Sequence, residues 1–97
     1  MLYYNQIKRK GFSHMKIYFV EVTFSARLPF YDFEVLESVR RAFTDAEKAD
    51  EWGMNIELRR TEAWEQLREE YGKDAPDWPD DLMWEETKQY REVELED

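Results

Sequence analysis

The chain has 97 residues, a mass of 12.0 kDa and a formal net charge of −9, from 23 acidic and 14 basic side chains. Its length suits a single domain, and its content of 42% hydrophobic and 16% aromatic residues is too high for a disordered acidic tail. The absence of cysteine excludes disulfides and thiolate chemistry, and the absence of a long apolar run or a signal-peptide pattern predicts a cytoplasmic protein without membrane contact.

The first 14 residues differ from the rest of the chain. They contain the basic run Lys8-Arg9-Lys10 without a helix or strand period, and we interpret residues 1–14 as a basic appendage to one domain over residues 15–97. Met15 directly precedes the first strand pattern, so the sequence leaves Met1 and Met15 open as the natural start.

Two strands are predicted next. Lys16–Phe24 alternates with period 2, and a loop over Ser25–Asp32 follows because Pro29 interrupts pairing. Residues 33–43 fit a helix locally, but a helix start directly after them favours a strand, and helix remains the open alternative. Four side chains of the first strand share one face: Tyr18, Val20, Val22 and Phe24.

Two helices follow the second strand. Thr44–Glu47 has capping-box spacing, so we expect Thr44 as N-cap and a helix that ends at Gly53. The second helix should cover roughly Glu57–Tyr71 and end at Gly72. Three of its side chains have the spacing of a buried face: Trp64, Leu67 and Tyr71.

The last part of the chain is predicted as a connector and a strand. Two prolines make residues 74–79 rigid, Asp80 is expected to cap a single turn through Trp84, and Tyr90–Leu95 reads as an edge strand. The element order is ββααβ, which predicts an α+β fold with a small three-stranded antiparallel sheet packed against helices.

The candidate binding residues lie in the acidic half. Residues 45–97 contain nineteen acidic and seven basic side chains. Acids three or four apart on a helix lie about 5–6 Å apart at Cβ, and alternate acids on a strand lie about 6.8 Å apart, which is the scale of consecutive phosphates. A solubilising surface is the alternative interpretation. The candidate partner-binding residues are Glu62, Glu65, Glu69, Asp74, Asp77, Trp78, Asp80, Asp81, Glu85, Glu86, Glu92 and Glu94.

Aromatic residues accompany these acids. Trp78 stands between two prolines and is the best candidate for exposure, whereas Trp64 and Trp84 are expected in the core. Exposed rings that anchor and carboxylates that steer are typical of protein interfaces.

No catalytic, metal-binding or cofactor-binding residue is predicted. The only histidine, His14, lies in the appendage, and no serine lies in a nucleophile elbow. Asp77 followed by Glu86-Thr87-Lys88 superficially resembles the PD-(D/E)xK signature of metal-dependent nucleases. A nuclease needs a basic groove for its substrate, so this acidic half argues against nuclease activity and against direct nucleic-acid binding.

In size, in the strand Lys16–Phe24 and in two acidic segments, Asp74–Glu86 and Glu92–Asp97, the chain resembles phage-encoded host-takeover inhibitors, particularly small acidic anti-CRISPR proteins that mimic double-stranded DNA. The resemblance implies a non-enzymatic inhibitor in the bacterial host cytoplasm that needs no cofactor. Its carboxylates would occupy the basic DNA channel of a CRISPR surveillance complex, with type I-F as the leading target. Residues Ala42–Trp52 also resemble a strand-to-helix junction of small phage and bacterial domains.

The alternative function is a non-enzymatic regulatory or structural protein-interaction module of phage or bacterial origin, in which aromatic residues such as Trp78 dominate binding. For either function we expect a monomer or a weak dimer.

Overall fold

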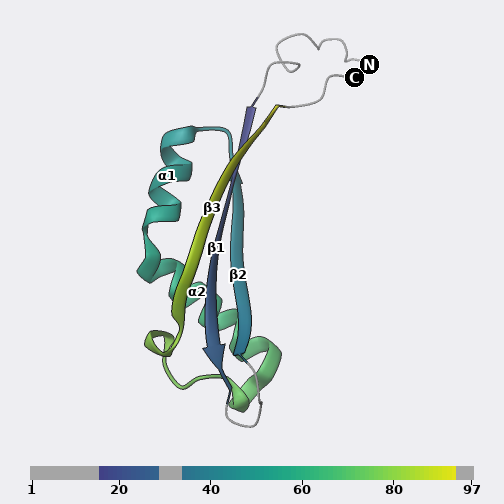
Figure 1. Cartoon of the computed structure of the whole chain (residues 1–97), viewed down its shortest axis with the longest axis vertical. Coiled ribbons are helices and arrows are strands. Elements are labelled where there is room, and N and C mark those ends of the chain that lie inside the picture. The colour runs from purple at the N-terminus through teal and green to yellow at the C-terminus, as the bar shows by residue number, and fades with distance from the viewer. Residues whose placement is uncertain (1–15, 29–33, 94–97) are drawn as a thin grey trace, which may run out of the picture.

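The computed structural model describes residues 16–28 and 34–93, without the side chains of residues 91–93. The appendage, Met15, Pro29 and Glu94 therefore lie outside the described residues. The elements in chain order are β1 (Lys16–Arg27), β2 (Glu34–Phe43), α1 (Ala46–Met54), α2 (Ile56–Tyr71), the single turns η2 (Gly72–Asp74) and η3 (Pro79–Asp81), and β3 (Met83–Val93) (Figure 1). The predicted α+β fold with ββααβ order is confirmed, and residues 34–43 form a strand.

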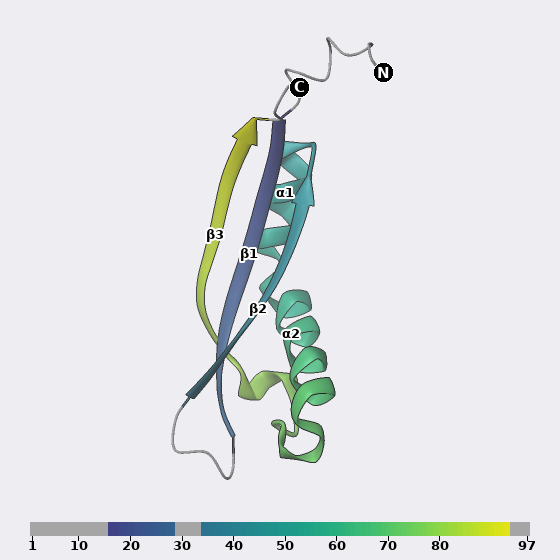
Figure 2. The same cartoon turned by 90° about the vertical axis from the view of Figure 1, so that its right-hand side faces the viewer.

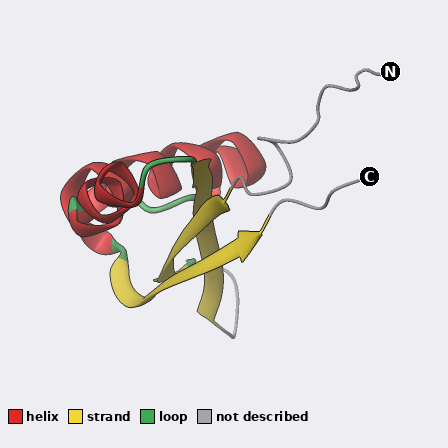
Figure 3. Cartoon of the chain, turned by 90° about the horizontal axis from the view of Figure 1, so that it is seen from above, coloured by secondary structure: helices red, strands yellow, loops and turns green. Residues whose placement is uncertain are grey.

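The sheet has β1 at its centre, with the strand order β2-β1-β3 and antiparallel pairing on both sides. Both helices lie against the same face of this sheet (Figures 2 and 3). The long strands make the molecule elongated, with principal extents of 55 × 24 × 18 Å.

The core follows from the alternation of β1. Val20, Val22 and Phe24 have no exposed surface, and Tyr18 is partly buried beside them. The helices supply the small residues Ala49 and Ala63 together with larger side chains. Small residues on the helices allow a close approach to the sheet.

The helix boundaries differ from the predicted ones at two positions. The N-cap of α1 is Asp45 and not Thr44, because the helix begins at Ala46 and the Asp45 carboxylate accepts hydrogen bonds from the backbone N–H groups of Glu47 (2.8 Å) and Lys48 (3.4 Å). Gly53 lies inside α1, which ends at Met54. The predicted end of α2 at Gly72 is confirmed.

Gly53 is the point of closest approach between α1 and the sheet. A Cβ at this position would lie 2.9 Å from Val20 Cγ1 and 3.6 Å from Thr87 Cγ2. Val20 is fully buried, so making room for the added methyl group disturbs the core, and Gly53→Ala should lower the free energy of unfolding by about 1 to 2 kcal/mol, although alanine is the better helix former. Urea unfolding measures the change, with Glu51→Ala on the exposed face of α1 as control. Unchanged or increased stability of Gly53→Ala would contradict this packing.

The C-terminal strand was predicted wrongly in its extent. Asp80 was expected to cap a turn through Trp84, whereas Asp80 lies inside η3, whose N-cap is Trp78 and which ends at Asp81. β3 begins at Met83 and not at Tyr90. Residues 83–89 lack apolar alternation, and their strand conformation comes from pairing with β1. A bulge at Thr23/Phe24 leaves Glu85 without a residue opposite it in the β1–β3 register, and Trp84 pairs with Phe24. Trp84 is 47% exposed there, contrary to the expected core position.

Candidate functional site

The structure divides the predicted site residues into two groups, and Glu94 lies outside the described residues. The larger group lies along the lower end of the molecule in Figure 1. Its residues come from α2, from the connector between α2 and β3, and from the start of β3. Glu92 is paired with Ile17 at the opposite end of β3, away from this group. The lower group contains Glu62, Glu65 and Glu69 of α2, then Asp74, Asp77, Trp78, Asp80 and Asp81, and finally Glu85 and Glu86.

The connector is held to the domain at both of its ends. The indole Nε1 of Trp64 donates a 2.8 Å hydrogen bond to the carbonyl of Pro76, and Arg60 Nε donates a 3.1 Å bond to the carbonyl of Leu82. Leu82 is buried in the core. These contacts fix the backbone that carries the acidic residues between them.

Trp78 lies within this connector, directly before η3. Its side chain is 68% exposed, the highest value of the four tryptophans, as the sequence predicted. The Asp81 carboxylate accepts a 3.3 Å hydrogen bond from the Trp78 backbone N–H, and the Asp81 N–H donates a 3.1 Å bond to the Trp78 carbonyl. The exposed ring is therefore presented by an ordered turn.

Some carboxylates of this group already form hydrogen bonds within the protein, and others do not. Asp77 and Asp80 are exposed and form no ion pair or side-chain hydrogen bond with another described residue. In contrast, Glu85 Oε2 accepts a 2.6 Å hydrogen bond from the hydroxyl of Ser25, a residue that is only 3% exposed. Asp81 and Glu85 therefore support the local structure, whereas Asp77 and Asp80 are available to a partner.

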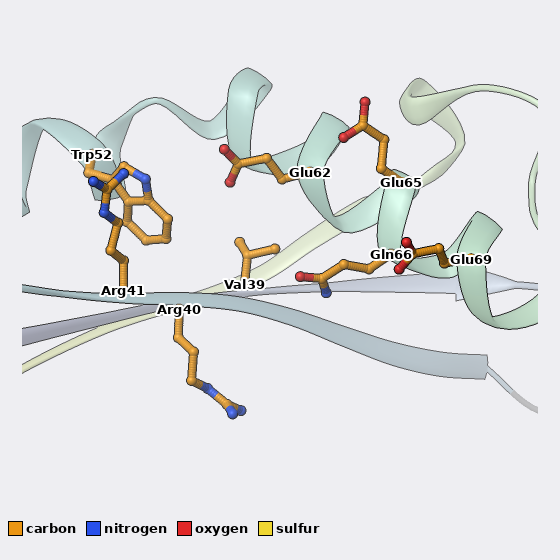
Figure 4. A pocket seen from close by; sticks show the side chains of 8 residues that line it. All are labelled: Val39, Arg40, Arg41, Trp52, Glu62, Glu65, Gln66 and Glu69. Carbon is orange, nitrogen blue, oxygen red and sulfur yellow. The ribbon is translucent and has the colours of Figure 1, made fainter.

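On α2 the acidic residues line a groove of about 390 Å³ against β2. Figure 4 shows Glu62, Glu65 and Glu69 extending from α2, while Arg40 points away from it on the other side of β2. The three acids are separated along the helix axis by about 4.5 Å and about 6 Å, from a rise of about 1.5 Å per residue. Together they form an anionic ridge on one side of α2.

Arg59 was missed by the sequence analysis. It is buried, its Nη1 donates a 2.9 Å hydrogen bond to the Trp52 carbonyl, and its Nη2 donates a 3.0 Å bond to Glu62. Its guanidinium also stacks on the Trp52 ring, 4.3 Å from the centroid. An Arg and a Glu three residues apart on a helix were the available signal. Arg59 neutralises Glu62, and Glu65 and Glu69 form no ion pair among the described residues.

Glu37 on β2 belongs to the edge of the same groove. Gln66 Nε2 donates a 2.6 Å hydrogen bond to Glu37 and a 3.1 Å bond to the Ser38 carbonyl. Partial burial raises the pKa of Glu37 above its usual value, the Gln66 hydrogen bond opposes that shift, and the charge of Glu70 adds to it. The ionised form of Glu37 is thus disfavoured in the folded protein.

This pKa shift predicts a pH-dependent effect on stability. Because the pKa of Glu37 is higher in the folded than in the unfolded chain, its destabilising contribution should appear as pH rises from about 4 through the folded-state pKa. Glu37→Gln should therefore raise the free energy of unfolding at pH 7, by at most about 0.5 kcal/mol because the side chain is only partly buried, and have no effect near pH 3.5. Urea unfolding at the two pH values, with Glu34→Gln as control, measures this. A less stable Glu37→Gln protein at pH 7 would contradict it.

Within residues 16–28 and 34–93, no group of three or more metal-ligating side chains is placed to hold a metal ion. No helix in the described residues is long and apolar enough to cross a membrane. Comparison with known proteins gave no match to a family model, to a curated protein or to a solved structure.

Proposed function

We propose that the protein is a non-catalytic inhibitor that mimics DNA and occupies the basic groove of a nucleic-acid-binding complex. The observation that carries the proposal is the set of exposed carboxylates on α2 and the connector that have no cationic partner among the described residues. Its clearest members are Glu65, Glu69, Asp77 and Asp80. Such a surface attracts a partner lined by Lys and Arg and repels nucleic acid itself.

The way in which these carboxylates are held also supports binding. The connector is fixed by the Trp64 and Arg60 hydrogen bonds, so little conformational freedom is lost when its acids bind. Glu65 and Glu69 project from a regular helix, which sets their spacing independently of a partner. A preformed row of charges is what a groove built for a phosphate backbone would recognise.

The first candidate partner is a CRISPR surveillance complex, with the type I-F complex leading, in the cytoplasm of a bacterial host. The protein would occupy the channel that binds target DNA and prevent DNA binding without turnover. The test is competition between the protein and a labelled target duplex for the purified complex. Loss of the DNA-bound species at near-stoichiometric protein would support the proposal. Undiminished DNA binding at a large excess of protein would exclude this partner.

A second candidate function is a regulatory or structural interaction module anchored by Trp78. The 68% exposure of this ring on an ordered turn favours it, since buried tryptophan anchors often dominate interface energies. Trp78→Ala would then weaken binding more than any charge reversal. If the protein mimics DNA, charge reversal should instead weaken binding more than Trp78→Ala does.

A further inference from the structure

The two edge strands of the sheet, β2 and β3, differ in how their outer edges are covered. On β2, Gln66 of α2 reaches across and donates to the backbone carbonyl of Ser38. No hydrogen bond among the described residues reaches the backbone of β3 from outside the sheet. An uncovered edge of this length is a template for another strand.

The charges on β3 are arranged symmetrically around Thr87. Glu86 and Lys88 flank it, project from the same face of the sheet and lie 3.7 Å apart. If two copies of β3 pair antiparallel with Thr87 at the centre, Glu86 of each copy lies opposite Lys88 of the other. A two-fold interface needs this self-complementarity. Centring the pairing on Glu86 or on Lys88 would instead place like charges opposite each other.

Apolar surface lies next to the same point on the helix side of β3. A hollow of about 290 Å³ between α1 and β3 is lined by Gly53, Met54, Ile56 and Thr87 among others. Met54 is 78% exposed, and Trp84, which donates a 2.9 Å hydrogen bond to the Thr87 hydroxyl, is 47% exposed. A second copy at this edge would cover side chains that are costly to leave in water.

We propose that β3 pairs antiparallel with β3 of a second copy, centred on Thr87, and joins the two sheets into one. The bulge at Glu85 limits the length of regular pairing, and the net charge of −9 on each copy opposes association, so the dimer is weak. A two-fold axis perpendicular to the joined sheet keeps both helix layers on one face. The inference rests on the geometry of β3 and not on the proposed function.

Charge swaps at Glu86 and Lys88 test this register by sedimentation equilibrium of the full chain. Wild type should show a monomer–dimer equilibrium, and Glu86→Lys or Lys88→Glu alone should each weaken association at least tenfold. An equimolar mixture of the two variants should recover a heterodimer, because each Lys then faces a Glu. Circular dichroism verifies that both variants are folded.

Glu51→Lys and Lys73→Glu, away from the edge, are the matched controls, because they change net charge by the same amounts. Each control and their mixture should associate like wild type, apart from the general effect of net charge. Three results would overturn the proposal: a monomeric wild type at the highest attainable concentration, single edge variants that associate like their controls, or a mixture of edge variants that does not recover association.

Discussion

Reversing Asp77 and Asp80 to Lys should weaken binding to a basic partner by at least tenfold and leave the fold intact. Both side chains are exposed and have no ion pair or side-chain hydrogen bond in the described structure, so their replacement breaks no internal contact. Placing a positive charge against a Lys/Arg groove costs free energy, and a loss of about 1.4 kcal/mol is already tenfold in affinity. The affinity is measured by competition with labelled duplex.

The structure shows which acidic residues can be reversed without breaking an internal contact, so the whole acidic cluster need not be changed. Asp81 and Glu85 are left unchanged because they accept hydrogen bonds from the Trp78 N–H and from Ser25. A double reversal of Asp50 and Glu51 on α1 changes the net charge equally and serves as the control. Equal losses for the two pairs would mean that affinity follows net charge and not the connector surface.

Replacing Arg59 by Ala should lower the free energy of unfolding by about 3 kcal/mol. The change removes the hydrogen bond to the Trp52 carbonyl, the ion pair with Glu62 and the stacking on the Trp52 ring, and leaves a cavity between the two helices. Urea unfolding followed by circular dichroism measures the loss.

The control for Arg59 is Arg68→Ala. Arg68 also lies over a tryptophan ring, with its guanidinium 5.0 Å from the Trp64 centroid, but its side chain is exposed. Its removal should cost less than about 1 kcal/mol. Similar losses for Arg59→Ala and Arg68→Ala would contradict a special role of the buried guanidinium.

The elements that sequence predicted correctly are those with a local signal. The alternation of Val20, Val22 and Phe24 defined the buried face of β1, and Gly72, whose φ is +59°, marked the end of α2. The polar first half of β3 carries no such signal, because its conformation depends on pairing with β1. Arg59 was missed because arginine is rarely buried and its partner Trp52 belongs to the other helix.

The candidate site was predictable to a similar extent. The position of Trp78 between Pro76 and Pro79 predicted its exposure, and the residue composition of the connector predicted its acidic character. The division of the acids into available and engaged groups was not predictable, because the bond between Glu85 and Ser25 joins residues 60 positions apart. Long-range contacts of this kind decide which charges remain free for a partner.

In the proposed DNA mimic, carboxylates, and not the tryptophan ring, supply the binding energy. The most direct measurement is the dissociation constant of the wild-type protein and its purified target between about 50 mM and about 200 mM salt, the range over which phosphate-type contacts weaken strongly. We predict that the dissociation constant rises at least tenfold over this range. A dissociation constant independent of salt would contradict DNA mimicry.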